Sequence, residues 1–403
     1  MMLKLIKVAL ESGRGTASTL SALWTFPSIL LSAFVIAWGA EAAQFLMSQG
    51  LALAILAWMQ TLPEFAVEAV IAWKAGKDPS QTHLAIANFT GSLRLLVGLG
   101  WPMIYFVAAI SGYKAAGRKF VDVTLHEEHS IEIFGLLLPI LYFTFIWWKG
   151  SLSVWDAAPL ILTYILYLWA LWRIPPQEEN EEALEDLGVI PRTILGMPGR
   201  RRNLAIWALF IVGGLILYLA AHPFLDSMLA IAVSLNVSTF VFVQWVAPFL
   251  SEFPEKLSAF YWARKVKTAN VALMNMVSSN INQWSILSAM IPILFAISAG
   301  EMRPLVFDAH QRSEILLTIL QSMLGFLLLL NLRLSLHEAI ILFVFWLIQF
   351  AIPSSRDIML YVYLGWCAVE AARLLFRGVP PPAWVGLRHT MARRLDRTNG
   401  ATT

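Results

Sequence analysis

Apolar residues run in long stretches along this chain, and short polar segments separate them from about residue 22 to residue 376. A helix of about 20 apolar residues is long enough to cross the hydrocarbon of a bilayer. The pattern therefore predicts an all-α polytopic membrane protein with eleven spanning helices. They are expected near residues 22–47, 51–74, 83–111, 130–148, 154–172, 204–233, 238–263, 269–298, 313–331, 335–352 and 357–376.

The longest polar interruption, residues 174–203, divides the chain into two units. It holds an acidic run and then Arg200, Arg201 and Arg202, and it is too short for a folded regulatory domain. We expect a first unit of five helices with an N-terminal arm, the linker, a second unit of five helices, and an extra helix with a basic tail. Their ranges are 1–173, 174–203, 204–352 and 353–403. The arginines of the tail are expected to meet anionic lipid.

Composition agrees with a membrane protein. The 403 residues are 58% hydrophobic and only 14% charged, whereas soluble domains carry about 25% charged residues. The net charge of +3 is too small, and its basic residues too scattered, for nucleic-acid binding. No P-loop, other nucleotide motif or haem signature is present, so we expect no cofactor. The single cysteine, Cys367, cannot form an intrachain disulfide.

Basic residues are unevenly divided between the two predicted sides of the membrane. Nine Lys and Arg residues lie on the side of the N-terminus and eighteen lie on the opposite side. Cytoplasmic loops carry the excess of Lys and Arg. We therefore expect a multi-pass protein of the cell (plasma or inner) membrane, with the N-terminus outside and both the linker and the C-terminus in the cytoplasm.

Two proline–glutamate pairs interrupt the predicted spans, Pro63-Glu64 in the first unit and Pro254-Glu255 in the second. A proline inside a helix removes one backbone hydrogen bond and frees the carbonyl four residues earlier. A carboxylate in the hydrocarbon region needs a partner or water, and by default it marks an ion or proton path. An asparagine follows each pair, Asn88 after Glu64 and Asn275 after Glu255. This doubled arrangement predicts a site near the bilayer midplane of a repeat-built transporter.

The two units also match outside these pairs. Leu152–Ala157 reads LSVWDA, and Leu334–Ala339, 182 residues later, reads LSLHEA. Five helices precede the linker, and the next five repeat them. Because five is odd, the second copy enters the bilayer from the opposite side. The sequence thus predicts two inverted five-helix repeats followed by one extra helix.

The doubled motifs resemble those of the calcium/cation antiporter superfamily, the sodium/calcium-exchanger type of membrane protein. That family carries G-T-S-L-P-E on one helix and G-N-x-x-G-S-N-x-x-N on the next. The first unit has Met59-Gln60-Thr61-Leu62-Pro63-Glu64 and Ala87-Asn88-Phe89-Thr90-Gly91-Ser92-Leu93. The second has Leu250-Ser251-Glu252-Phe253-Pro254-Glu255 and Met274-Asn275-Met276-Val277-Ser278-Ser279-Asn280. The resemblance covers most of residues 22–352 and implies an exchanger whose two Pro-Glu helices hold the transported ion.

Four positions depart from the family pattern. The last motif position, a second amide or carboxylate facing the ion, falls on Leu96 in the first unit and on Gln283 in the second. Glu252 stands where the family has a small hydroxyl residue, and Arg94 stands where it has an apolar one. We treat Arg94, Asn280 and Gln283 as residues that modulate the site.

The side chains near the two pairs form an oxygen-rich set, which suits a hard cation such as Ca²⁺. The set lacks the thiolates and imidazoles that softer metals favour. Glu64 and Glu255 are the expected metal ligands and the essential anionic groups. The other expected ion-binding residues are Thr61, Ser251, Asn88, Asn275, Glu68 and Glu252.

Charge limits what this set can hold. If Glu64, Glu68, Glu252 and Glu255 share one space with Arg94 and Lys256, the formal sum is −2. One divalent cation, or two sodium ions or protons, would neutralise it, and Arg94 could replace one monovalent ion. Other interpretations stay open. The essential carboxyls could be structural, Glu68 and Glu252 could neutralise Arg94 or Lys256, and the asparagines could bridge helices.

We expect a secondary active antiporter that exchanges Ca²⁺, or another cation, for Na⁺ or H⁺ by alternating access in the lipid bilayer. The alternative is a degenerate exchanger-fold membrane protein that binds ions or partners without exchange, which Arg94, Leu96 and Gln283 make credible. An intramembrane enzyme would need a nucleophile–base pair or a catalytic metal set, and the sequence offers neither.

Overall fold

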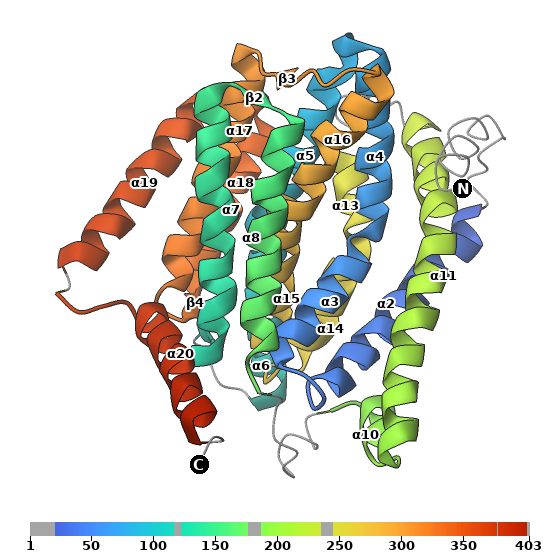
Figure 1. The fold of residues 1–403 in the computed structure, drawn as a ribbon, viewed down its shortest axis with the longest axis vertical. Coiled ribbons are helices and arrows are strands. Elements are labelled where there is room, and N and C mark those ends of the chain that lie inside the picture. The colour runs from blue at the N-terminus through green and yellow to red at the C-terminus, as the bar shows by residue number, and fades with distance from the viewer. Residues whose placement is uncertain (1–20, 117–121, 176–186, 235–244, 377, 401–403) are drawn as a thin grey trace.

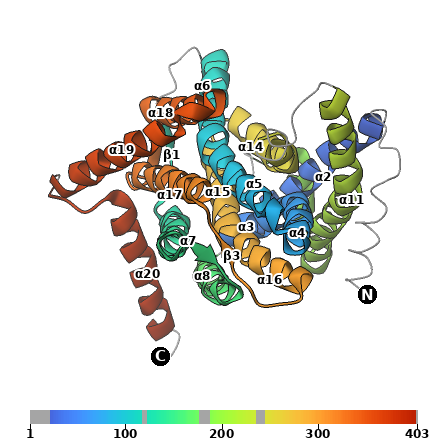
Figure 2. The same ribbon diagram turned by 90° about the horizontal axis from the view of Figure 1, so that it is seen from above.

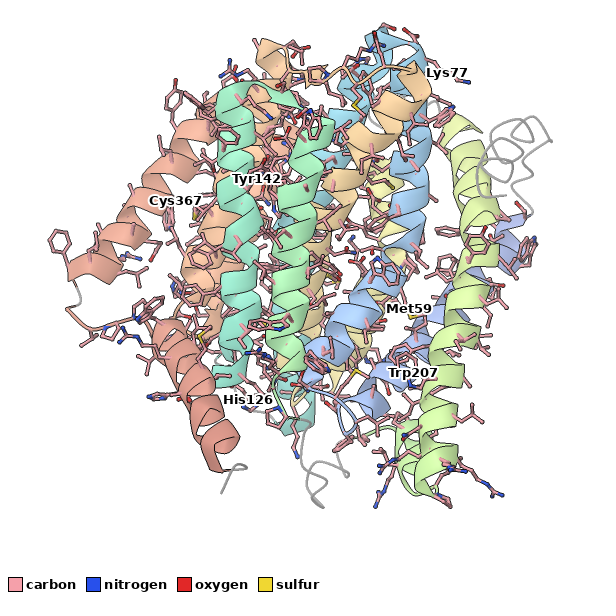
Figure 3. All side chains as sticks on the ribbon, in the orientation of Figure 1. Met59, Lys77, His126, Tyr142, Trp207 and Cys367 are labelled. Atoms are coloured by element: carbon pink, nitrogen blue, oxygen red, sulfur yellow. The ribbon has the colours of Figure 1, made fainter. Side chains whose placement is uncertain are left out.

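The protein is a bundle of long helices that run roughly parallel to one axis (Figure 1). The computed structural model describes residues 21–116, 122–175, 187–234, 245–376 and 378–400. Figure 2, which looks along that axis, shows α5 and α15 surrounded by the other helices. Lys77 lies at one end of the bundle and His126 at the other (Figure 3).

The described residues of the first unit form seven α-helices, and π-helical residues join two of them, α5 and α6. Its elements are α2 (Ala22–Ala43), α3 (Gln49–Gln60), α4 (Leu62–Lys77), η2 (Pro79–Gln81), α5 (Thr82–Leu95), η3 (Leu96–Gly100), α6 (Trp101–Ala116), β1 (Asp122–Thr124), η4 (Glu127–His129), α7 (Ser130–Lys149), β2 (Ser151–Leu152) and α8 (Val154–Trp172).

The linker contains a short helix, α10 (Val189–Leu195). Its predicted acidic run, residues 178–186, lies outside the described residues. The second unit follows the same order as the first. Its elements are α11 (Gly199–Ser234), α13 (Ala247–Ser251), α14 (Phe253–Arg264), α15 (Ala269–Asn282), η6 (Gln283–Leu287), α16 (Ser288–Ala299), β3 (Leu305–Val306), α17 (Ala309–Leu329), β4 (Arg333–Ser335) and α18 (Leu336–Ala351).

Most of the predicted spans correspond to helices that are long and apolar enough to cross a membrane. Eight described helices meet this condition, and α3 with α4 makes a ninth if this pair, bent by 47°, is one span. α18 is shorter, and the predicted span 238–263 includes residues outside the described ranges. The number eleven therefore stays a prediction.

The innermost helices are α5 and α15. Every residue from Ala85 to Leu95 on α5 is buried, and so is every residue from Ala272 to Asn282 on α15. By contrast, α8, α11 and α19 expose large apolar side chains such as Trp155, Leu204 and Leu375. Apolar exposure on this scale is expected where lipid, not water, surrounds the helices.

Two short antiparallel sheets connect the units reciprocally. β1 pairs with β4, and β2 pairs with β3. The Leu125 N–H donates to the Leu332 carbonyl (2.8 Å), and the Phe307 N–H donates to the Gly150 carbonyl (3.0 Å). Each residue of the second bond lies 182 positions from its counterpart in the first. Such an exchange supports the predicted inverted repeat, because a two-fold relation between the units requires it.

The turns that carry these carbonyls also match. Gly150 and Leu332 both have positive φ angles, +77° and +56°. Capping boxes follow at the starts of α8 and α18, made by Ser153 with Asp156 and by Ser335 with Glu338. These local signals lie within LSVWDA and LSLHEA, so the similarity of the two sequences reflects the same turn and the same helix start.

The C-terminal part contains a helix that the sequence analysis did not predict. After η7 (Pro353–Ser355) and the predicted extra helix α19 (Arg356–Phe376), α20 (Pro382–Gly400) packs against η4 and α7. The Ala383 N–H donates to the Leu330 carbonyl (3.0 Å), and the Trp384 ring lies 5.6 Å from the Phe134 ring. The first turns of the basic tail are therefore docked on the bundle.

Candidate ion-binding site

Two helix breaks position the site. α3 ends at Gln60 and α4 begins at Leu62, while α13 ends at Ser251 and α14 begins at Phe253. In α4 and α14 the proline lies in the first turn, where a missing N–H costs no helical hydrogen bond. The glutamates that follow the prolines also lie in these first turns. A helix N-terminus carries partial positive charge, which stabilises a carboxylate there.

Glu64 is fully buried and is held from both units. The Ser251 hydroxyl, on α13, donates to Glu64 Oε2. The Asn88 amide, on α5, donates to Glu64 Oε1 at 3.0 Å. The structure thus brings together three of the predicted ligands, from two units and three helices.

Glu68 shares the same amide. The Asn88 Nδ2 atom lies 2.6 Å from Glu68 Oε2, so one asparagine bridges two carboxylates one helical turn apart. Glu68 Oε1 and Asn88 Oδ1 are both buried and have no hydrogen-bond partner among the described residues. Two acceptor oxygens therefore remain available beside Glu64.

Glu255 is the second essential carboxylate of the predicted site. It is fully buried, and neither of its oxygens has a hydrogen-bond partner within the described ranges. The residue before it, Pro254, accepts through its carbonyl from the Gln60 amide at the first break (3.5 Å), and Ser251 of the second break donates to Glu64. The two Pro-Glu breaks therefore lie side by side.

Glu252 lies in a different environment from Glu255. The Lys256 ammonium, one helical turn further on, forms an ion pair with Glu252 Oε2. Glu252 Oε1 accepts from the Ser92 hydroxyl and from the Gln283 amide (3.1 Å). The Gln283 side chain, predicted to modulate the site, therefore contacts one of its carboxylates.

Thr61 and Asn275 are engaged by other polar side chains. The Thr61 hydroxyl donates to the Trp58 carbonyl (3.0 Å) and accepts from the Asn282 amide (2.6 Å). The Asn275 amide donates to Gln60 Oε1 (3.2 Å). Thr61 lies at the first helix break and Asn275 lies inside α15, and neither forms a hydrogen bond to Glu64 or Glu255 among the described residues.

Buried acceptor oxygens without donors are concentrated around the breaks. In the described part of the chain they include Glu68 Oε1, Asn88 Oδ1, both Glu255 oxygens, Asn275 Oδ1, Asn280 Oδ1 and Asn282 Oδ1. Polar groups buried without partners are costly and rare in folded proteins. A cation or water would satisfy them. This acceptor-rich set is what a hard cation requires.

No three acidic, histidine or cysteine side chains converge as a metal ligand set among the described residues. Any ion bound in this conformation would therefore need amide and hydroxyl oxygens beside the carboxylates. Ca²⁺ accepts such mixed oxygen ligands.

Arg94 does not contact the site carboxylates, contrary to the assumption behind the charge sum. Its guanidinium donates to Glu314 on α17 and to Gln349 Oε1 on α18 (3.1 Å), not to Glu64 or Glu68. Its Nε atom donates to the Thr90 carbonyl (3.1 Å). The long side chain runs away from the carboxylates because α5 is buried on every side, and α17 offers an acid.

This correction changes the charge of the site. Among the described residues, the Lys256 ammonium is the one cation beside Glu64, Glu68, Glu252 and Glu255, so the formal sum is −3 instead of −2. Glu252 and Lys256 cancel one another. Three carboxylates remain uncompensated.

The remaining departure from the family pattern, Leu96, is fully buried in η3 and supplies no oxygen. Asn280, expected to modulate the site, is buried, but neither of its amide atoms has a hydrogen-bond partner within the described ranges. Its contribution to the site stays a prediction.

Sequence reasoning missed four polar neighbours of the site, Gln60, Ser92, Ser258 and Asn282. The Gln60 amide donates to the Ser258 hydroxyl (2.6 Å) across the two breaks. A signal was present, because Ser92 follows Asn88 by four positions and Asn282 follows Asn275 by seven. Those spacings place each pair on one helical face.

Comparison with known proteins identifies the family. A model of the family described as "Sodium/calcium exchanger protein" matches residues 16–173 and 205–353. The chain belongs to the sodium/calcium exchanger protein family. Its relatives are exchangers, so it is an integral multi-pass membrane transporter and not an enzyme.

Solved exchanger structures share this fold. A crystal structure of the H⁺/Ca²⁺ exchanger CAX is 29% identical, with a TM-score of 0.76, and covers 98% of both chains. A structure of the sodium-calcium exchanger NCX_Mj is 19% identical, with a TM-score of 0.60, and covers 83% of this chain and 99% of that one. Another NCX_Mj structure, at 18% identity, has a TM-score of 0.58. At these identities the NCX_Mj likeness shows the fold alone. A comparison with curated protein sequences finds no match.

Proposed function

We propose that this exchanger-family protein is a secondary active antiporter that exchanges Ca²⁺, or another hard cation, for Na⁺ or H⁺. One observation carries the proposal. The Ser251 hydroxyl, from the second Pro-Glu break, donates to Glu64 in the first, and several buried acceptor oxygens around the breaks have no donor among the described residues. Intramembrane carboxylates of this kind are expected along ion paths.

The choice of ions follows from charge and from the relatives. Three uncompensated carboxylates attract a divalent cation strongly, and the one remaining negative charge can be neutralised by a sodium ion or a proton. The CAX structure is named for H⁺ and Ca²⁺, and the NCX_Mj structures for sodium and calcium. Both counter-ions therefore stay open for this chain.

Alternating access requires a part of the protein to move past the site. α2 and α11 are candidates, because they pack along each other at the edge of the bundle (Figures 1 and 2). Gly39 lies against Phe210, and Gly213 lies against Ile36, so the two helices approach closely. We propose that this pair slides against α4 and α14 when the carboxylates are neutralised.

Polar contacts of Glu41 join this pair to the rest of the bundle. Glu41 on α2 accepts from the Trp262 indole on α14 (2.6 Å) and pairs with Lys265 (3.2 Å). These contacts lie near the linker end of the bundle. By the distribution of Lys and Arg we propose that this end faces the cytoplasm and that the N-terminus is outside.

The test is ion flux in proteoliposomes. Purified protein should take up radiolabelled Ca²⁺ when an outward gradient of Na⁺ or H⁺ is imposed, and Glu64→Gln and Glu255→Gln should each abolish the uptake. Glu301→Gln is the matched control, since Glu301 is exposed and pairs only with Arg303 among the described residues. Uptake that persists in both site variants would refute the site.

The same experiment tests the alternative, an exchanger-fold protein that binds ions without exchanging them. Leu96 favours this alternative, because it supplies no oxygen at a position where the family has a ligand. In that case the wild-type protein would bind Ca²⁺ in detergent, as measured by equilibrium binding, without gradient-driven uptake. Separate Na⁺ and pH gradients then identify the counter-ion in an active exchanger.

A further inference from the structure

The four carboxylates near the helix breaks differ in how fully they are satisfied. Glu255 has two buried oxygens without hydrogen-bond partners in the described ranges, and Glu68 has one. Glu252, by contrast, is bonded through both oxygens, to Lys256 on one side and to Ser92 and Gln283 on the other. Glu252 is therefore satisfied by protein groups, whereas the Glu255 oxygens are left open to an ion or to water.

The lysine that satisfies Glu252 is itself buried. Lys256 is only 5% exposed, and its ammonium lies 5.6 Å from the Phe249 ring centre. A lone ammonium at this depth would be costly, and pairing with a carboxylate makes it tolerable. The i, i+4 spacing on α14 places the two charges on one helical face.

Comparison of the two units shows that the first has no equivalent of this pair. When Pro63 is aligned with Pro254, Glu252 falls on Thr61 and Lys256 falls on Phe65. The first unit therefore has a hydroxyl and an aromatic ring where the second has an acid and a base. The second unit thus carries one negative and one positive charge that the first lacks, and together they leave the net charge of the site unchanged.

We propose that the Lys256 ammonium is a tethered cation that occupies the place of one monovalent ion beside Glu252. The inference rests on the proposed function, because a fixed charge sets stoichiometry only where free cations bind. An ammonium carries the same charge as Na⁺ and meets a carboxylate at the same kind of site, but it cannot be released. The protein therefore needs one dissolved monovalent cation fewer than its four carboxylates alone would require.

Lys256 thus determines ion stoichiometry without being a ligand of the transported ion. The ions that bind and leave are confined to Glu64, Glu68 and Glu255, where acceptor oxygens are left over. Ser92 and Gln283 keep Glu252 directed at the ammonium. Gln283 uses both ends of its amide. Its Nε2 atom donates to Glu252, and its Oε1 atom accepts from the Ser92 hydroxyl at 3.0 Å.

The test is the number of monovalent ions bound by purified protein in detergent, measured with radiolabelled Na⁺ by scintillation proximity at alkaline pH. Lys256→Met keeps the length of the side chain and removes the charge. It should bind one more Na⁺ per protein than the wild type. The charge-balanced variant Glu252→Gln/Lys256→Met should return to the wild-type number.

Two further variants serve as controls. Lys265→Met makes the same chemical change at the end of α14, where the lysine pairs with Glu41, and should leave the number of bound Na⁺ ions unchanged. Lys256→Arg keeps the charge and should also bind as the wild type does. At lower pH a proton should replace the extra Na⁺ of Lys256→Met, so its Na⁺ binding should weaken as pH falls.

The outcomes separate this inference from the proposed function. A gain of Na⁺ in Lys256→Met supports the tethered cation even if no Ca²⁺ exchange is detected in the wild type. A folded Lys256→Met that binds the wild-type number of Na⁺ ions at every pH, in a protein that does exchange, overturns it. If Lys256→Met does not fold, flux is measured for the variant Glu252→Gln/Lys256→Met instead. The inference is supported if this variant moves the same charge per Ca²⁺ as the wild type. It is refuted if the charge moved per Ca²⁺ differs.

Discussion

Two groups of buried charges lie in the same bundle. They differ in the sign of their net charge and in whether all their acceptor oxygens have hydrogen-bond donors. Around the helix breaks, four carboxylates outnumber a single ammonium, and acceptor oxygens are left without donors. Around Glu314, two guanidiniums, those of Arg94 and Arg356, meet one carboxylate. Both groups connect several helices. Of the two groups, only the first has buried acceptor oxygens without donors among the described residues.

The Glu314 group is a structural network by its contacts. Arg94 Nη1 reaches Gln349, which donates to Gln321 (2.8 Å) and to the Tyr363 hydroxyl (3.1 Å). The Gln321 amide in turn donates to the backbone carbonyl of Arg94 (2.9 Å). The network therefore ties α5 to α17, α18 and the extra helix α19. The difference teaches that burial of charge alone does not mark an ion site, whereas unmatched acceptors do.

The largest expected effect comes from neutralising one acid in each group. Glu255→Gln should lower Ca²⁺ uptake at least about 100-fold, because losing a buried charged contact costs about 3 kcal/mol. Its melting temperature should fall little. Glu314→Gln should behave in the opposite way and lose about 3–5 kcal/mol of stability, since two buried guanidiniums lose their counter-charge.

Uptake in proteoliposomes and thermal unfolding in detergent measure the two effects. If Glu255→Gln unfolded while Glu314→Gln stayed stable and lost transport, the roles of the two groups would have to be exchanged.

Arg94→Met sharpens the same comparison. The variant leaves Glu314 paired with Arg356 and removes the bonds to Gln349 and to the Thr90 carbonyl, so stability should fall by about 2 kcal/mol. Ion stoichiometry should not change, because Arg94 does not face the site carboxylates. Thermal unfolding gives the first quantity and the charge moved per Ca²⁺ gives the second. A changed stoichiometry would return Arg94 to the ion site.

Asn88→Ala should have a smaller effect on transport than the loss of a carboxylate. Asn88 bridges Glu64 and Glu68 through one amide, and removing hydrogen bonds to charged groups costs about 1.5 kcal/mol. We expect Ca²⁺ affinity about tenfold weaker with the maximal rate largely kept. Gln321→Ala, in the Glu314 network, is the control and should leave affinity unchanged. An equal loss of affinity in both variants would contradict the distinction.

The smallest effects are expected outside both groups, at the matched capping boxes. Ser153→Ala and Ser335→Ala each remove an N-cap hydroxyl from a helix start, which costs about 1 kcal/mol. Because the two boxes hold corresponding positions of the two units, the two losses should be similar, and transport should be unaffected. Clearly unequal losses of stability would argue against equivalent environments for the two turns.

The sequence predicted the parts of the site that depend on local spacing. Glu64 and Glu68 share a face because they are one turn apart, and the prolines place the helix breaks beside Glu64 and Glu255. Asn88 was predicted as a ligand and does contact Glu64. Ser92 and Asn282 were overlooked, because helices buried on all sides give no polar face by which to orient them.

What the sequence determined by itself was set by short-range physics. Apolar runs specify helices long enough for a bilayer, proline and capping residues specify where helices break and begin, and the doubled motifs specify the family. The tertiary structure decided which charges meet. Arg94 turned to Glu314 on α17, whereas Lys256 stayed with Glu252, because a long side chain pairs with the nearest acid in space. Which acid is nearest depends on how helices far apart in the chain pack together.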